Sequence, residues 1–457
     1  MLQTKNYWTD YPITYRTEQI ETIMGWVTAG ESGVVVGGSG TGKSNLAGFL
    51  GSRPEAINPF VRDNPDDYLF LHLDINSLPM LTVPFFYRGL VQTLQDASER
   101  LGPEVRQAMQ QLTAGQMHWN DAFQVLTLLQ KAYRLVIHQA NKTIIWLLDR
   151  FDAACLQLDA QTLSSLRSLR DQFKGRLCYV VFTRHPLARL RNPSEIDEFH
   201  EIVAANTCRI GPMVERDALW VTHQMAERLN TTFSQIEIEY LFAVTGGLPA
   251  FLKLGCLALA EGAISEEQSR AEWTECLLAR PEFKRNCQEI WDDLLPEEEM
   301  VLVALVSGAD ERQVDQDTAD YLEQAGLLTR SASEAKLHIF SPIFEQFIRQ
   351  QRGGAPGMLE LHPKTRSVLR DGVPLEIELT PSEDRLLAFF LEHSGELCSK
   401  DALVRSVWAD DEVYEGVQDD RLAQLIRRLR QKIEPDANKP TYIQTVRGQG
   451  YRFVQPE

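Results

Sequence analysis

Cysteine and histidine are sparse in this sequence, and neither is arranged as a metal or redox motif. The seven cysteines are scattered with no C-x-x-C pair, and the nine histidines form no cluster. An odd, unpatterned set of cysteines predicts reduced, buried thiols and no disulfide framework. Such usage is typical of a cytosolic protein, and the missing ligand spacing predicts no metal site built from cysteine and histidine.

Long hydrophobic runs are missing as well. No apolar stretch approaches the ~20 residues that cross a bilayer as a helix. The first six residues, MLQTKN, lack the charged-then-apolar pattern of a secretory signal. We therefore expect a cytoplasmic protein without a membrane partner. The 457 residues leave room for roughly three or four domains of ordinary size.

Positive charge is scarce overall but concentrated near the C-terminus. The formal net charge of −18 argues against a protein that binds nucleic acid over its whole surface. Residues 421–455 nevertheless hold eight basic side chains against two acidic ones, and an acid-rich stretch at 410–420 precedes them. A local basic patch on an acidic protein indicates one specific surface that contacts DNA.

The run GGSGTGKS at residues 37–44 fits the pattern G-x-x-x-x-G-K-[ST] in full. It follows the apolar residues 34–36 and leads into a helix-like run, which is the context that a phosphate-binding loop requires. The glycines let successive backbone N–H groups form an anion nest, and the helix N-terminus behind them adds partial positive charge. A glycine-rich turn that only joins a strand to a helix is the alternative.

This loop predicts a site for ATP or ADP with Mg²⁺. Lys43 would reach the β and γ phosphates, and the Ser44 hydroxyl would bind Mg²⁺. The nucleotide-binding residues that we predict in the loop are Gly37, Gly38, Ser39, Gly40, Thr41, Gly42, Lys43, Ser44 and Asn45.

Apolar strand-like runs alternate with helical patterns in the N-terminal part of the chain. We expect strands at 34–36, 68–74, 143–149 and 177–182, and helices at about 84–101 and 120–139. Continuous apolar strands separated by helices predict a parallel sheet that is covered on both faces. The expected fold class of this part is therefore α/β.

Polar side chains that follow two of these strands are the predicted catalytic residues. Asp149 ends a strand where a carboxylate would hold Mg²⁺ opposite Ser44; an ordinary polar strand end is the alternative. Arg184 follows the next strand, where a cation would sense the γ-phosphate; a solvated arginine is the alternative. Arg150 stands where many related ATPases carry the glutamate that orients water. We therefore expect Asp152 to substitute for that glutamate and hydrolysis to be slow.

In their order, these motifs resemble the STAND branch of the AAA+ ATPases. The matching runs are YRTE at 15–18, the phosphate loop, the strand ending in Asp149, TRHP at 183–186, RIGPM at 209–213 and TGGLP at 245–249. The resemblance implies that Arg16 lies near the nucleotide, that Arg184 is the sensor arginine and that Pro249 contacts the adenine. It also implies a switch that is closed with ADP and that opens and self-associates with ATP.

The segment 417–433 has the two faces of a groove-reading helix. Apolar residues recur at helical spacing on one side, namely Leu422, Leu425, Ile426, Leu429 and Ile433. The other side carries Arg421, Gln424, Arg427, Arg428 and Gln431. Arginine and glutamine side chains can reach base edges in a DNA groove. A solvated basic face is the alternative.

With the hairpin-like run YIQTVRGQGYRF at 442–453, this segment closely resembles the OmpR/PhoB-type winged helix over about residues 359–455. The resemblance implies double-stranded DNA as partner, a bacterial cytosol as location and the helix from Val417 in the major groove. It makes Arg428 a base reader, Arg430 a phosphate contact and Arg447 a minor-groove contact. The predicted DNA-binding residues are Arg421, Gln424, Arg427, Arg428, Arg430 and Arg447. Asp420 and Arg421 depart from common family residues, so the sequence preference does not carry over.

The expected domains are a P-loop NTPase core (1–208), a helical lid (209–281), an internal winged helix (282–350), a linker (351–357) and a winged-helix DNA-binding domain (358–457). The leading hypothesis is an ATP-gated, DNA-binding signal switch, most plausibly a transcription regulator, that self-associates with ATP. Its signal would come through an unknown partner protein, through the lid region or by another route. The alternatives are an ATP-dependent DNA-loading, transposition or initiation ATPase, and a STAND defence sensor.

Overall fold

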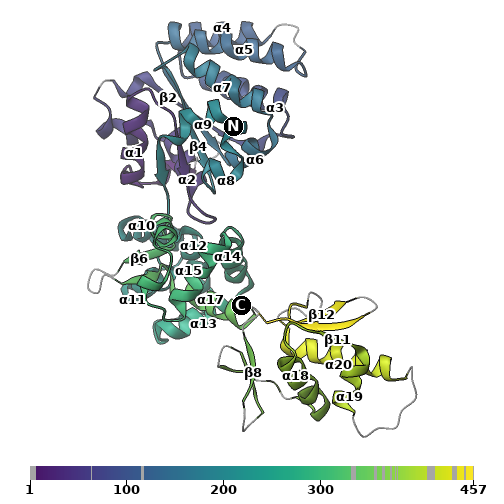
Figure 1. Cartoon of the computed structure of the whole chain (residues 1–457). Coiled ribbons are helices and arrows are strands. Elements are labelled where there is room, and N and C mark those ends of the chain that lie inside the picture. Colours follow the sequence, from purple (N-terminus) through teal and green to yellow (C-terminus); the bar gives the residue numbers. More distant parts are fainter. Residues whose placement is uncertain are drawn as a thin grey trace. The chain divides into compact units, whose positions relative to one another are not determined.

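The computed structural model describes two compact units, Met1–Glu345 and Gln346–Glu457 (Figure 1). The described residues are 7–62, 64–114, 118–330, 336–354, 358–362, 366–370, 373–375, 377, 379–408, 417–434, 440–446 and 449–455. The first unit contains the phosphate loop, and the second contains the helix at 417–433.

A five-stranded parallel sheet forms the centre of the first unit. In spatial order its strands are β2 (Tyr68–Asp74), β3 (Thr143–Asp149), β4 (Leu177–Thr183), β1 (Gly33–Val36) and β5 (Thr207–Arg209). All residues of β1, β3 and β4 are buried, as expected of parallel strands that are covered on both faces. The predicted α/β fold of this part is confirmed.

Helices alternate with the strands and lie around the sheet (Figure 1). They are α1 (Thr17–Thr28), α2 (Lys43–Ser52), α3 (Val83–Ser98), α4 (Pro103–Thr113), α5 (Ala122–Arg134), α6 (Phe151–Gln157), α7 (Ala160–Gln172), α8 (Leu187–Leu190) and α9 (Asp197–Ala204). The predicted helical patterns correspond to α3 and to α5 with the π-helical turn Leu135–Gln139 that continues it. Helix α4 was not predicted, although its apolar residues recur at helical spacing and Val105 and Met109 are buried.

The register of the sheet brings the predicted functional positions to one edge. Asp74 at the end of β2 pairs with Asp149 at the end of β3, and Val36 at the end of β1 pairs with Thr183 at the end of β4. The phosphate loop leaves β1 at this edge. In parallel α/β sheets the carboxyl ends of the strands are where ligands bind, so the topology places the candidate site there.

A helical segment follows the sheet within the first unit. Its elements are α10 (Glu215–Arg228), α11 (Gln235–Thr245), α12 (Pro249–Ala260), α13 (Arg270–Ala279), α14 (Pro281–Asp292), α15 (Pro296–Val306), α16 (Gln316–Gln324) and a hairpin of β6 (Leu328–Arg330) and β7 (Leu337–Ile339). Helix α17 (Pro342–Gly354) runs into the first positions of the expected linker. The finer division into lid and internal winged helix stays a prediction.

The second unit combines three helices with two small sheets. The helices are α18 (Pro381–Glu392), α19 (Lys400–Val407) and α20 (Val417–Ile433). The strands are β8 (Leu359–Leu361), β9 (Val368–Arg370) and β10 (Val373–Pro374) in one sheet, and β11 (Leu397–Cys398), β12 (Ile443–Val446) and β13 (Gly450–Phe453) in the other. Their apolar side chains form one core. The expected helix at 417–433 and the expected C-terminal hairpin are both present.

Within the described ranges, no helix has the length and apolarity needed to cross a membrane, and no cluster of three or more histidine, cysteine or acidic residues could hold a metal ion. The cysteines are free, and six of them are buried, but Cys276 is exposed on α13. The expectation of buried thiols therefore fails at Cys276.

Candidate nucleotide site and DNA-binding surface

The phosphate loop between β1 and α2 has a backbone that only glycine fits. Gly40 and Gly42 have φ angles of 76° and 89°, which side-chain-bearing residues rarely adopt. A Cβ atom at Gly37 would lie 2.3 Å from the carbonyl oxygen of Ile210. The loop is therefore a tight cradle that opens α2 at Lys43, as a phosphate-binding nest requires.

Lys43 places its amino group inside this cradle. Its Nζ donates to the carbonyl of Gly38 at 2.9 Å and also to the carbonyl of Gly37. Burial lowers the pKa of Lys43 to about 8, and the nearby carboxylate of Asp152 opposes this effect. A half-buried cation held among loop carbonyls fits the phosphates of a nucleotide, which would supply the missing negative charge.

Asp149 lies beside the loop as a buried carboxylate and is only 1% exposed. Its Oδ2 atom makes no hydrogen bond among the described residues, and His72 Nε2 lies 4.0 Å from it. Burial raises the pKa of Asp149, but His72 and the Ser44 hydroxyl outweigh that effect and lower the pKa below its usual value. An ionised carboxylate with an unused oxygen beside a hydroxyl fits a hard cation such as Mg²⁺.

His72 was not among the predicted site residues. It interrupts the apolar strand β2, YLFLHLD, with a half-buried ring. A histidine in the middle of a strand was the available signal, but spacing alone does not relate it to Asp149. The two residues meet only because β2 and β3 are neighbours in the sheet.

The position after Asp149 is occupied by an arginine that pairs with the next strand. Arg150 has a φ of 57° and is the N-cap residue of α6, and its NH1 lies 3.1 Å from Asp74 Oδ2. Asp152, in the first turn of α6, accepts a hydrogen bond of 2.8 Å from the backbone N–H of Arg184. Asp152, the residue predicted to orient water, also lines the cavity that contains the phosphate loop.

Arg16 and Pro249 connect the loop to the helical segment. Arg16 is 3% exposed, and its NH2 donates to the carbonyls of Thr41 and Gly211, both at 2.9 Å. Pro249 begins α12, and the next residue, Ala250, donates its backbone N–H to the Gly40 carbonyl at 3.2 Å. Both residues thus lie against the loop, and their contacts with a nucleotide stay predictions.

A cavity of about 750 Å³ joins these parts. It is lined by the loop from Ser39 to Asn45, by Asp149, Asp152, Arg184 and Pro249, and by residues that were not predicted, among them Lys253 and Asp293. A volume of this order suits a small-molecule ligand. Gly37 and Gly38 line an adjoining inner cavity of only about 50 Å³.

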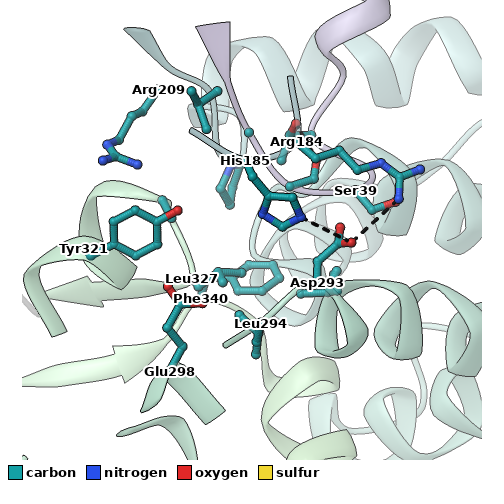
Figure 2. A pocket seen from close by; sticks show the side chains of 18 of the residues that line it. Ser39, Arg184, His185, Arg209, Asp293, Leu294, Glu298, Tyr321, Leu327 and Phe340 are labelled. Atoms are coloured by element: carbon teal, nitrogen blue, oxygen red, sulfur yellow. Dashed lines mark hydrogen bonds and ion pairs between the residues drawn. The ribbon is translucent and has the colours of Figure 1, made fainter. Parts of the chain in front are cut away.

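The helical segment also contacts the core through acidic side chains. Arg184 NH1 and His185 Nε2 lie 3.7 and 3.8 Å from Asp293 Oδ1 (Figure 2). The Ser39 hydroxyl lies 2.9 Å from Glu289 Oε2. The residues of these pairs are about 100 and 250 positions apart in the sequence, so no local sequence pattern predicts the contacts.

The second unit presents the predicted DNA-binding helix, α20. Leu422, Leu425, Ile426, Leu429 and Ile433 are buried in the core, whereas Arg421, Gln424, Arg427 and Arg428 are exposed. The guanidinium of Arg421 lies over the Trp408 ring at 5.2 Å. The two faces are therefore arranged as the sequence predicted.

Arg430 differs from the exposed arginines of α20, because its side chain is hydrogen-bonded within the second unit. Arg430 donates to the Ile443 carbonyl and, at 2.9 Å, to Thr445 Oγ1, so its side chain fastens α20 to the hairpin. Burial lowers the pKa of this guanidinium. A phosphate contact from Arg430 stays a prediction, and it would compete with these bonds. Arg447 lies outside the described residues.

Buried charges hold the hairpin to the end of α20. Glu434 accepts hydrogen bonds from the backbone N–H groups of Thr441, Tyr442 and Ile443 at 2.7–3.0 Å. Arg370 donates to the Ile433 carbonyl at 2.7 Å. Hydrogen bonds to buried charges therefore join the end of α20 to strands β12 and β9.

Comparison with known proteins decides the nature of this unit. Residues 375–453 match the family described as "Transcriptional regulatory protein, C terminal". The C-terminal part of the chain is an OmpR/PhoB-type winged-helix DNA-binding domain. The sequence is similar to the alkaline phosphatase synthesis transcriptional regulatory protein PhoP of Bacillus subtilis, with 39% identity over 83 residues, which are 18% of this chain and 33% of that protein.

A second relative is the phosphate regulon transcriptional regulatory protein PhoB of Escherichia coli. It is 35% identical over 120 residues, which are 26% of this chain and 48% of PhoB. The chain thus spans between a third and a half of the length of these curated relatives. The first unit has a five-stranded parallel sheet with the glycine-rich loop between β1 and α2. A solved structure that overlaps it is the Walker-type ATPase PABY2304 of Pyrococcus abyssi, with 13% identity, a TM-score of 0.45, and coverage of 74% of this chain and 98% of that one.

Proposed function

We propose that this chain is an ATP-gated transcription regulator of the bacterial cytosol. The observation that carries the proposal is the presence, in one chain, of a phosphate loop with a lysine and a carboxylate beside it and of a DNA-binding domain of the transcriptional-regulator type. A nucleotide site joined to such a domain suits the control of DNA binding by nucleotide state.

At the nucleotide site, each residue has a distinct role. Ser44 and Asp149 hold Mg²⁺, and Lys43 binds the β and γ phosphates. Asp152 orients water in place of the glutamate that Arg150 replaces. Because Arg150 is paired with Asp74, turnover is slow and the ATP-bound state is long-lived, which suits a switch better than a motor.

At the DNA site, α20 enters the major groove. Arg428 reads bases, and the exposed Arg421, Gln424 and Arg427 support it from the same helix. Arg447 contacts the minor groove. Phosphate contacts add affinity that is independent of sequence and that falls steeply with salt, because they release counterions.

Self-association connects the two sites. ADP keeps the protein closed, and ATP opens it so that several copies bring their winged helices to repeated half-sites. Linking binding modules raises the overall affinity without any new contact. The activating signal enters through a partner protein that contacts the first unit.

The test is a salt-titrated DNA-binding assay on a selected duplex, run with ADP and with ATP. The expected result is tighter binding with ATP and a slope of the affinity against salt that steepens as more copies bind. Equal affinity with both nucleotides would contradict the gating. Assembly of a closed ring around the duplex would favour the DNA-loading function instead.

A further inference from the structure

Three acidic residues of the helical segment lie against the phosphate-loop side of the core. Glu289 on α14 contacts Ser39 of the loop, with 2.9 Å between Oε2 and the hydroxyl. Asp293, directly after α14, lies near Arg184 and His185. Glu298 on α15 pairs with Arg189, with 2.6 Å between Oε1 and NH2. Of these three acids, Asp293 is the one that lines the larger cavity beside the phosphate loop.

Asp293 has the most direct relation to the nucleotide site. It lines the same cavity as Lys43, Ser44 and Asp149, and its charge is one of those that act on the Lys43 amino group. Figure 2 shows the side chains of Arg184 and His185 turned toward it. Its Oδ2 atom is buried and makes no hydrogen bond among the described residues.

At this position the carboxylate of Asp293 competes with a nucleotide phosphate for the guanidinium of Arg184. A guanidinium that is paired with a carboxylate must leave it before it can pair with another anion. A carboxylate next to an added phosphate is also repelled by it, more strongly than in water because the site is partly buried. A diphosphate adds less charge at the site than a triphosphate does.

We propose that Asp293 makes the nucleotide site selective for ADP over ATP by holding Arg184 and His185 in the closed arrangement. The proposal rests on the proposed function and adds the residue that sets the nucleotide preference. ATP binds with full affinity only when Arg184 has left Asp293, and that exchange separates α14 from the core. Asp293 is thus a specificity-determining residue supplied by the helical segment.

The test measures ADP and ATP binding to the full chain by calorimetry in Mg²⁺, with a slowly hydrolysed ATP analogue as a further ligand. The wild type is expected to bind ADP more tightly than ATP. Asp293→Asn is expected to lower that preference by roughly tenfold, within the usual range of couplings between sites. Asp293→Glu keeps the charge and is expected to keep the preference.

Asp292→Asn is the matched control, because Asp292 is an exposed neighbour that pairs with Gln288 on its own helix. Equal ADP-to-ATP ratios in Asp293→Asn and Asp292→Asn would overturn the inference while leaving nucleotide binding intact. Absence of nucleotide binding in the wild type would instead overturn the proposed function. If Asp293→Asn does not fold, Asp293→Ser removes the same charge with a smaller side chain. It is also expected to lower the preference for ADP over ATP, and an unchanged preference would overturn the inference.

Discussion

Among single residues, Lys43 is the one on which the predicted nucleotide affinity depends most. Its amino group lies within the loop and is hydrogen-bonded to loop carbonyls. Burial lowers its pKa to about 8, so the positive charge is held at a cost that a bound phosphate would relieve. Nucleotide affinity should therefore depend on both the presence and the protonation of this side chain.

Replacing Lys43 by alanine is expected to abolish tight nucleotide binding while the fold survives. Charge-assisted hydrogen bonds contribute about 1.5–3 kcal/mol each, so the expected loss of affinity is roughly a hundredfold. Calorimetry with ATP measures the loss, and circular dichroism checks the fold. Lys131→Ala, at an exposed position of α5, is the charge-matched control. Equal ATP affinity in Lys43→Ala and in the wild type would contradict the site.

The lowered pKa of Lys43 gives a pH dependence with a definite sign. The free protein loses this charge as the pH rises through about 8, so nucleotide affinity is expected to fall above that pH. Binding at pH 9 should then take up protons, because the phosphates restore the charged lysine. Calorimetry in buffers of different ionisation enthalpy measures this uptake. Proton release on binding would contradict the role of Lys43.

Asp152 governs the expected rate of hydrolysis. ATP turnover of the wild type is expected to be well below the ~10 s⁻¹ of a typical enzyme. The reason is that Arg150, which is paired with Asp74, stands where related ATPases carry the glutamate that orients water. Asp152→Asn is expected to slow it further without changing ATP affinity. A phosphate-release assay measures both rates, with the exposed Asp171→Asn as control. An unchanged rate in Asp152→Asn would mean that another group orients the attacking water.

Among the elements, the buried strands could be predicted closely from sequence. β2 and β3 have the expected bounds because their runs are apolar and end in aspartate. β5 was not predicted, since its three residues, TCR, are too short and too polar for a strand pattern. The helix α20 was predicted with its observed bounds because its apolar period is strong and unbroken.

The two faces of α20 should separate stability from DNA binding. Leu425 is fully buried, so Leu425→Ala is expected to lower the stability of the second unit by about 2–5 kcal/mol. Arg428 is exposed, so Arg428→Ala is expected to keep the stability but to cost about 1–3 kcal/mol of DNA binding and to relax base preference. Thermal melts and a binding assay measure the two effects, with the exposed Arg106→Ala as control. DNA binding by Arg428→Ala equal to that of the wild type would contradict the assigned role.

At the scale of the molecule, the sequence predicted the parts but not the contacts between distant segments. The resemblance implied that Arg16 lies near the nucleotide and that Pro249 contacts the adenine, and in the structure both residues lie against the phosphate loop. It gave no indication of His72 beside Asp149, or of Asp293 facing Arg184. Such pairs depend on sheet order and on how α14 packs against the core, and no local periodicity encodes either.

The central claim is that the nucleotide sets the assembly state and thereby DNA binding. Light scattering after size-exclusion chromatography tests it most directly, with ADP or a slowly hydrolysed ATP analogue, and with or without duplex DNA. We predict a monomer with ADP, a larger assembly with the ATP analogue that retains DNA, and a monomer under both conditions for Lys43→Ala. The same mass with both nucleotides, or an ATP-induced assembly in Lys43→Ala, would contradict the account.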